Sequence, residues 1–254
     1  MTAAIPMEEV LRGPWTRRPA VLADLDGCLV AGSTVLPQVP ELVSACGDRL
    51  WIVSNNSTDT AVGLARRLAD LGLEQPAERI LLAGEETLRA LAVMHPGARV
   101  ALMAAPPLQA LARDLGLTLS DRDAEIVVLA RDTGFGFADL ARLAALVVRG
   151  ASVWLTNPDT SHPGSDGVPV PETGALYAAL CAMVTPRVVT CIGKPAPDLI
   201  RKALARASVL PPAAVYIGDN PLTDGGAAAA AGVDFVQVVT PSMAPALEAG
   251  HASC

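Results

Sequence analysis

The stretch Ala20-Val21-Leu22-Ala23-Asp24-Leu25-Asp26-Gly27 decides how this 254-residue chain is interpreted. Four apolar residues, typical of a strand covered on both faces of a sheet, run directly into two aspartates and a glycine. Where the backbone turns away from the strand, the two carboxylates can point to the same side, and Gly27 permits the tight turn. Because the carboxylates repel each other, a bound cation would keep both ionised. The same residue types also form ordinary turns, so this stretch alone leaves chemistry and turn geometry open.

Strand-like and helix-like segments alternate on both sides of this stretch. Further short apolar runs, expected to be strands, occupy residues 50–53, 80–82, 99–103, 126–130, 152–156, 187–192, 214–217 and 235–239. Helices are expected at 60–71, 85–94, 107–115, 137–149, 174–183, 197–207 and 222–231. The alternation predicts an α/β fold with helices on the faces of a parallel sheet.

The pattern restarts after His95-Pro96-Gly97, and a loop rich in Pro, Gly, Ser and Asp follows at 157–171. We therefore expect two units. Residues 1–82 and 172–254 would form a core, and residues 83–171 would form an inserted α/β unit.

The composition excludes several classes of protein. A hydrophobic share of 51% makes disorder improbable, and a net charge of −7 with a pI near 4.9 argues against a nucleic-acid partner. No uncharged apolar run is long enough to cross a membrane, and the first residues lack a signal pattern. The odd number of scattered cysteines indicates reduced thiols in a cytoplasmic protein: Cys28, Cys46, Cys181, Cys191 and Cys254.

Three further polar clusters follow predicted strands. The run Ser54-Asn55-Asn56-Ser57 could hold phosphoryl oxygens or cap a helix. Gly193-Lys194-Pro195 offers a compact positive charge, although such a tripeptide is also a common surface turn. Asp219 and Asp224, in Gly218-Asp219-Asn220-Pro221-Leu222-Thr223-Asp224, could complete an oxygen-rich magnesium site or favour a helix start. Since all four clusters would lie at strand ends of one sheet, their order favours a phosphate and magnesium site.

These motifs are similar to those of the haloacid dehalogenase (HAD) superfamily, specifically subfamily IIA, with its NagD-like and p-nitrophenyl-phosphatase-like proteins. The resemblance covers nearly the whole chain and rests on five segments: DLDGCL at 24–29, VSNNST at 53–58, LTNPDT at 155–160, GKPAPDLI at 193–200 and GDNPLTD at 218–224. It implies a Rossmann-like core with an inserted α/β cap of the C2 type.

The resemblance implies a magnesium-dependent phosphatase. Asp24 would be the nucleophile that forms an aspartyl-phosphate, and Asp26 would exchange protons with the leaving group and with water. Magnesium would be held by the Asp24 carboxylate, the Asp26 backbone carbonyl and Asp219, with Asp224 behind them.

The other expected site residues follow from the same resemblance. Ser54, Asn55 and Asn56 would hold the phosphoryl group, and Lys194 would offset its charge. The cap would select the substrate through Asn157, Asp159 and the loop at 161–171. For these cap residues, a loop-stabilising network of Asn and Asp side chains remains a nearly equal alternative.

Two segments depart from the pattern of the family. Gly225 and Gly226 stand where relatives usually have an aliphatic residue, and Ala130-Arg131-Asp132 replaces a more usual Gly-aliphatic-Asp. The second departure puts the substrate preferences of relatives in doubt here. Cys28, beside the expected site, is interpreted as a small packing residue.

Other interpretations stay open. A receiver domain would be about half as long, and a mutase usually carries a helical cap between the first two motifs, where only about 27 residues separate Asp26 from Ser54. A non-catalytic protein that binds phosphorylated metabolites should have lost a motif residue. Phosphoglycolate, pyridoxal phosphate, nucleoside monophosphates and sugar phosphates are all conceivable substrates, and a homodimer through the cap is conceivable too.

Overall fold

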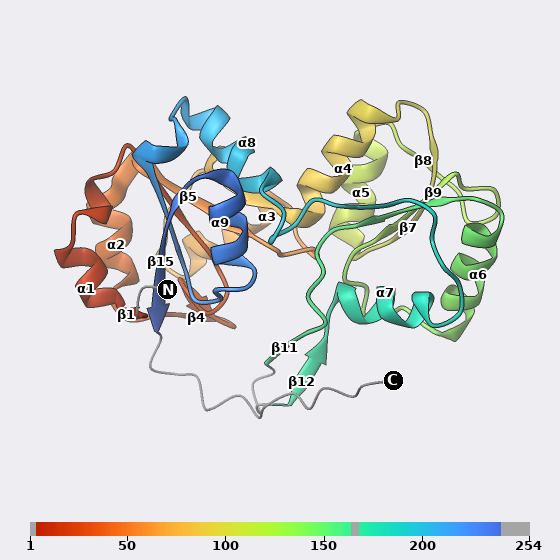
Figure 1. Ribbon diagram of the computed structural model, residues 1–254, viewed down its shortest axis with the longest axis horizontal. Coiled ribbons are helices and arrows are strands. Elements are labelled where there is room, and N and C mark those ends of the chain that lie inside the picture. The colour runs from red at the N-terminus through yellow and green to blue at the C-terminus, as the bar shows by residue number, and fades with distance from the viewer. Residues whose placement is uncertain (1–3, 164–167, 240–254) are drawn as a thin grey trace.

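A computed structural model of the chain describes residues 4–163 and 168–239. These residues form two α/β units side by side, each built on its own parallel sheet, joined near the start of α4 (Figure 1). The expected α/β fold with a parallel sheet is confirmed. Four residues of the expected specificity loop, 164–167, lie outside the described residues.

The first sheet has six strands in the order β1-β15-β14-β2-β5-β6, all parallel. Their bounds are Ile5–Pro6 (β1), Asp234–Val239 (β15), Ala214–Gly218 (β14), Ala20–Ala23 (β2), Leu50–Ser54 (β5) and Ile80–Leu82 (β6). The three central strands β14, β2 and β5 are buried along their whole length, which explains why they are almost purely apolar in sequence.

Helices cover both faces of this sheet. On one face pack α1 (Met7–Arg12), α2 (Val39–Cys46) and α3 (Ala61–Asp70), which contribute Val10, Leu42 and Leu64 to the core. On the other face pack α8 (Asp198–Ala207) and α9 (Asp224–Ala231), through Leu199, Ala203 and Ala227. Alanine lets α9 lie close to the sheet, so a core poor in aromatic residues is still well filled.

The second sheet has five parallel strands in the order β13-β10-β9-β7-β8. Their bounds are Val189–Cys191 (β13), Ser152–Leu155 (β10), Ile126–Leu129 (β9), Arg99–Met103 (β7) and Thr118–Leu119 (β8). The helices α4 (Ala83–Met94) and α5 (Pro106–Asp114) pack on one face, and α6 (Phe137–Val148) and α7 (Thr173–Cys181) on the other.

The expected end of the inserted unit at residue 171 is too early in the chain. Strand β13 was expected in the core, but Val189 to Cys191 pair with Val153 to Leu155 of β10 in the second sheet. Helix α7 packs on the same sheet, where Leu180 is fully buried. The second unit therefore extends to about Cys191, and the chain returns to the first unit through Gly193 and Lys194.

Several short elements were not expected from the sequence. They are β1, α1, α2, β8, the hairpin of β3 (Val30–Ala31) with β4 (Thr34–Val35), the hairpin of β11 (Ser161–Pro163) with β12 (Pro169–Pro171), and 3-10 turns at Trp15–Arg17, Gly47–Arg49, Ala77–Arg79 and Pro211–Ala213. Across residues 4–163 and 168–239, no helix is both long enough and apolar enough to cross a membrane.

Candidate active site

Three neighbouring strands of the first sheet end in polar residues at the same edge. Asp24 follows β2, Ser54 ends β5, and Asp219 follows β14. Because the strands are parallel, their carboxyl ends meet there, which is where ligands bind in such sheets. The backbone N–H of Asp24 donates to the carbonyl of Ile217 at 2.9 Å, which extends the pairing of β2 with β14 up to this residue.

Lys194 enters this edge from the second sheet, three residues after β13 ends. Its side chain is only 2% exposed, and Nζ donates to Asp24 Oδ1 at 2.7 Å and to Asp224 Oδ1 at 2.6 Å. Lys194 was expected to follow a strand of the first sheet. The structure corrects this, because the preceding strand pairs with β10.

Tyr216 was not predicted as a site residue, although it lies in the middle of β14. Lys194 Nζ donates to its hydroxyl at 2.9 Å, and that hydroxyl donates to the carbonyl of Val53 at 2.8 Å. A buried tyrosine needs a partner for its hydroxyl, so one tyrosine inside an otherwise apolar strand was the available signal. Its effect is to satisfy the third donor of a buried ammonium group.

Three carboxylates crowd around this lysine. One oxygen from each of Asp24, Asp219 and Asp224 lies within 4.8 Å of the others. Burial, reinforced by Asp224, raises the pKa of Asp24 well above its ordinary value, and Lys194 offsets this only in part. Burial and Asp224 also raise the pKa of Asp219 to about 6. Three carboxylates against one ammonium leave an excess of negative charge on oxygen donors, which fits a divalent cation.

Lys194 is protonated and carries the positive charge in this cluster. Burial alone would lower its pKa, but Asp224 and Asp24 outweigh burial and hold the pKa well above its ordinary value. Asp224 is fully buried and uses both carboxylate oxygens, because Oδ1 accepts from Lys194 and Oδ2 accepts from the backbone N–H of Asn220. Asp224 therefore positions Lys194 and the loop after β14. Because both of its oxygens accept hydrogen bonds, it is less available to bind a cation than Asp24 or Asp219.

Two glycines let these carboxylates approach the backbone. Gly27 has a φ of +81°, and a Cβ there would collide with Asp219 Oδ2. At Gly218 a Cβ would collide with Asp224 Oδ2. Gly225 and Gly226, the departure noted above, bring α9 close to the ring of Phe235 and to Pro195, at 3.2 and 3.1 Å from where a Cβ would lie. The helix still begins at Asp224, so these glycines do not loosen its start.

Asp26 is separate from the three crowded carboxylates. It is exposed at the open side of the site, whereas Cys28 behind it is fully buried, which supports a packing role for that thiol. The surrounding protein nevertheless desolvates the Asp26 carboxyl enough to raise its pKa, an effect that Lys194 and Arg67 partly offset. A carboxyl group with a raised pKa at an open position suits proton exchange with a ligand.

The loop after β5 joins the two units. Asn55 Nδ2 donates to Asp159 Oδ2 at 2.8 Å and to the carbonyl of Lys194 at 2.9 Å, and its Oδ1 accepts from the backbone N–H of Lys194 at 2.8 Å. Both side-chain N–H donors are thus used, so a phosphate contact of Asn55 would have to come from its backbone N–H. The Asn55 side chain positions Lys194 instead.

Ser54 and Asn56 differ in what they offer. Ser54 Oγ accepts from the backbone N–H of Asn56, and its hydroxyl hydrogen remains available to donate. Asn56 Oδ1 accepts from the backbone N–H groups of Thr58 and Asp59, which closes the turn before α3. For Asn56, the alternative prediction of a segment that caps the following helix therefore fits the structure better than phosphate binding does.

The two cap residues predicted to touch substrate form a network within the protein. Asn157 is buried, donates from Nδ2 to Asp159 Oδ2 at 3.1 Å, and accepts from Thr156 Oγ1 at 2.8 Å. Asp159 Oδ2 in turn accepts from Asn55. The loop-stabilising alternative thus accounts for Asn157, and Asp159 links the second unit to the loop after β5.

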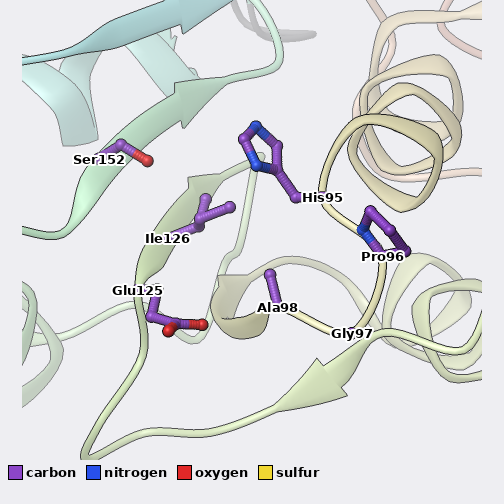
Figure 2. A pocket seen from close by; sticks show the side chains of 7 residues that line it. All are labelled: His95, Pro96, Gly97, Ala98, Glu125, Ile126 and Ser152. Atoms are coloured by element: carbon purple, nitrogen blue, oxygen red, sulfur yellow. The ribbon is translucent and has the colours of Figure 1, made fainter.

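An open hollow of about 450 Å³ lies elsewhere in the second unit (Figure 2). It is lined by His95, Pro96, Gly97, Ala98, Glu125, Ile126 and Ser152. These residues stand where β7, β9 and β10 begin, at the sheet edge opposite the one that leads into Lys194. The hollow is therefore separate from the carboxylate site.

Comparison with known proteins identifies the family. A family model described as haloacid dehalogenase-like hydrolase matches residues 21–118, and a second HAD-hydrolase-like model matches residues 191–252. Dihydroxyacetone phosphatase from Corynebacterium glutamicum is 30% identical over 220 residues, which cover 85% of this chain and 79% of that protein. The chain belongs to the haloacid dehalogenase-like hydrolases.

Solved structures of HAD proteins share its architecture. A glycerol phosphate phosphatase from Mycobacterium tuberculosis, in complex with magnesium, has a TM-score of 0.79 and 30% identity, and covers 88% of this chain and 69% of its own. NagD from Escherichia coli has a TM-score of 0.77 and 26% identity, and covers 87% of both chains. These similarities confirm the NagD-like subfamily and make this HAD protein a phosphoric monoester hydrolase. Together with the three carboxylates, they support a divalent metal at this site.

Proposed function

We propose that this enzyme hydrolyses the monophosphate ester of a small metabolite, with magnesium and through an aspartyl-phosphate on Asp24. The observation that carries the proposal is the pairing of Lys194 Nζ with Asp24 Oδ1 at 2.7 Å, inside a group of three carboxylates. A buried lysine beside a carboxylate at the carboxyl edge of the sheet suits the attack of that carboxylate on phosphate, because the ammonium offsets the charge of both anions.

The proposed reaction has two steps. In the first, Asp24 attacks phosphorus, the bond from phosphorus to the ester oxygen breaks, and Asp26 gives its proton to the departing oxygen. In the second, Asp26 takes a proton from water, the water oxygen attacks phosphorus, and the bond to Asp24 breaks to release phosphate. The raised pKa of Asp26 favours its protonated form before the first step.

The residues present fit magnesium. Asp24 and Asp219 would hold the ion with their carboxylates and Asp26 with its backbone carbonyl, whereas Asp224 would act through Lys194. Magnesium would supply positive charge to the phosphoryl oxygens and lower the pKa of Asp24, so that the nucleophile is ionised. Ser54 would donate its hydroxyl to the same phosphoryl oxygens.

The second unit, from residue 83 to about residue 192, would act as a cap over the leaving group. Its contact through Asp159 and Asn55, and its direct continuation into Lys194, support this role. A non-catalytic binding protein is disfavoured because each motif residue is present. A mutase is disfavoured by the absence of an insertion between Asp26 and Ser54 beyond the hairpin β3–β4 and helix α2. A homodimer through the cap and a cytoplasmic location stay predictions.

The decisive experiment is the hydrolysis of p-nitrophenyl phosphate by the purified protein. We expect turnover with magnesium, loss of turnover in excess EDTA, and a fall of at least about 10³-fold in Asp24→Asn, because the amide cannot act as the nucleophile. Undiminished turnover in that variant would contradict the mechanism.

Asp48→Asn is the matched control. It makes the same chemical change at an exposed aspartate that pairs with Arg79, away from the carboxyl edge. Its turnover should equal that of the wild type. Mass spectrometry after a rapid acid quench should detect phosphate on the peptide that contains Asp24 and on no other peptide.

A further inference from the structure

Arg131, Glu172 and His162 form a cluster at the carboxyl edge of the second sheet, outside the carboxylate site. Arg131 follows β9, His162 lies in β11, and Glu172 immediately precedes α7. Glu172 Oε1 lies 3.3 Å from Arg131 Nε and 2.7 Å from His162 Nδ1. Glu172 was not expected at the site, His162 was expected there only as part of the loop at 161–171, and Arg131 was noted only as a departure from the pattern of the family.

This cluster borders the place where the leaving group would lie. The backbone N–H of Arg131 donates to Ser57 Oγ at 3.1 Å, and Ser57 belongs to the loop that also carries Ser54 and Asn55. The Ser57 hydroxyl lies 3.1 Å from the hydroxyl of Thr173, the residue after Glu172. In addition, the charge of His162 is one of the influences that offset the burial-raised pKa of Asp26, so His162 is within electrostatic reach of that carboxyl.

The cluster retains hydrogen-bonding capacity. Arg131 Nε is buried against Glu172, whereas the side chain as a whole is 26% exposed and its terminal Nη groups make no hydrogen bond with any described residue. His162 and Arg131 both approach Oε1 of Glu172, and no described residue donates a hydrogen bond to Oε2. A guanidinium donor and a carboxylate acceptor thus stand side by side, a pattern that matches a hydroxyl group, which both accepts and donates.

Local charge decides between two classes of leaving group. Glu172 and Asp159 are close enough that Asp159 contributes to raising the pKa of Glu172, which burial raises most, and Asp26 adds a third carboxylate nearby. Three of the neighbouring groups, Arg131, His162 and Arg67, can carry positive charge, and Arg67 is itself paired with Asp59. A second anionic group on the substrate would therefore meet at least as much negative as positive charge, whereas a neutral hydroxyl group would not be repelled.

We propose that Arg131 and Glu172 determine specificity by binding hydroxyl groups of the leaving group, so that the substrate is the monophosphate of a neutral polyhydroxy compound. His162 acts as a positioning residue that holds Glu172 through Oε1. The proposal rests on the proposed phosphatase function, and adds to it the class of substrate and the residues that select it.

The test compares three phosphate esters with magnesium present: glycerol 3-phosphate, 2-phosphoglycolate and p-nitrophenyl phosphate. The wild type should prefer glycerol 3-phosphate to 2-phosphoglycolate by about tenfold or more in kcat/KM. Arg131→Met and Glu172→Gln should each lose about 10- to 100-fold in kcat/KM on glycerol 3-phosphate, mainly through a higher KM. Both should retain p-nitrophenyl phosphate turnover within about twofold, because that leaving group has no hydroxyl to bind.

Arg142→Met is the matched control for Arg131→Met. Arg142 has the same side-chain exposure, 26%, and also pairs with carboxylates, but it lies on α6, at the far end of the second unit from the first sheet (Figure 1). This variant should match the wild type on all three esters. His162→Gln should raise the KM for glycerol 3-phosphate and leave the KM for p-nitrophenyl phosphate unchanged, a difference that a merely structural role would not produce.

Three results would overturn the inference. They are a wild-type preference for 2-phosphoglycolate, unchanged kinetics of both variants on glycerol 3-phosphate, and an equal loss on all three esters. The failure of the proposed function looks different. In that case, the wild type would not hydrolyse p-nitrophenyl phosphate with magnesium, or Asp24→Asn would remain active.

Discussion

Because Gly27 has no side chain, the loop after β2 and the loop after β14 can lie against each other. The residue lies between Asp26 and Cys28 with a φ of +81°, and a Cβ at this point would collide with Asp219 Oδ2. The glycine is therefore needed twice, once for the turn after β2 and once for the approach of a carboxylate from the loop after β14.

Gly27→Ala should weaken the magnesium binding that we propose. Because the methyl group displaces Asp219, we expect the magnesium concentration for half-maximal turnover to rise about tenfold or more. The control is Gly32→Ala, which has a φ of +59° and meets no atom within 4 Å. Both variants carry backbone strain of about 1 kcal/mol, so a similar magnesium requirement in both would show that the contact with Asp219 is unimportant.

The roles of single residues could be predicted from the sequence only in part. Asp24 and Asp219 were expected together because each directly follows a predicted buried strand, and Asp224 because it lies near the start of the helix after the second of these strands; the structure brings their oxygens within 4.8 Å. The engagement of Asn55 could not be predicted, because its partner Lys194 is 139 positions away and reaches it through the second sheet. Tyr216 was not predicted as a site residue because a tyrosine fits the pattern of a buried strand, and that pattern does not reveal which groups its hydroxyl contacts.

Among the elements, α4 carries the chain from the first sheet to the second. Its first turn buries Glu86, whose side chain is 2% exposed and forms ion pairs with Lys202 and Arg206 of α8. At the start of the helix, Gly84 lies so close to Ser57 that a Cβ would be 2.9 Å from its Cα. These contacts fix α4 against the first unit although most of the helix packs on the second sheet.

Glu86→Ala should destabilise the protein by about 2–3 kcal/mol, because it removes a buried carboxylate with two charged donors. For a chain of this size, that corresponds to a fall in Tm of about 4–12 °C, measured by differential scanning calorimetry. Glu78→Ala, at an exposed position in the turn Ala77–Arg79, should change the Tm by about 1 °C or less. Equal Tm values for the two variants would contradict the assigned role of Glu86.

Element types were easier to predict than element partners. Strands β2, β5, β7 and β9 begin where the apolar runs begin, since burial on both sheet faces requires such runs. The sheet to which β13 belongs could not be predicted. Its three residues, Val189 to Cys191, do not indicate whether the strand pairs with β10 or with a strand of the first sheet. The short strands β8 and β11 were missed because two or three residues show no periodicity.

On the scale of the whole molecule, the crowded carboxylates link stability to pH and to metal. In the absence of metal, burial raises the pKa of Asp219 from 3.8 to about 6, so the folded state binds this proton more tightly than the unfolded chain does. The resulting stabilisation is present below pH 4 and is lost as the pH rises to about 6. At pH 7.5 the metal-free protein therefore carries the cost of an ionised, partly buried carboxylate.

Asp219→Asn should reverse its effect on stability when magnesium is added. In EDTA at pH 7.5, we expect the variant to unfold about 2–6 °C above the wild type, because the amide has no charge to desolvate. With magnesium at about 100 times its Kd, the wild type should gain about 2.7 kcal/mol and the variant much less, so the order of the Tm values should invert. The same order with and without magnesium would contradict the assignment of Asp219 as a metal ligand.

Lys194 follows the last strand of the second unit, and this position matters when the second units of relatives are exchanged. The lysine that neutralises Asp24 is delivered by the last strand of the second unit, and its backbone is held by Asn55 of the first. A chimera that transplants residues 83–171 would break β13 away from β10 and leave the lysine on a strand without its neighbour. A recombination point between Cys191 and Gly193 would transfer the complete foreign sheet and leave the native lysine in place beside Asp24, the proposed nucleophile. The second unit can thus be exchanged as a module, provided that the exchanged segment ends before Gly193 and leaves Lys194 in the first unit.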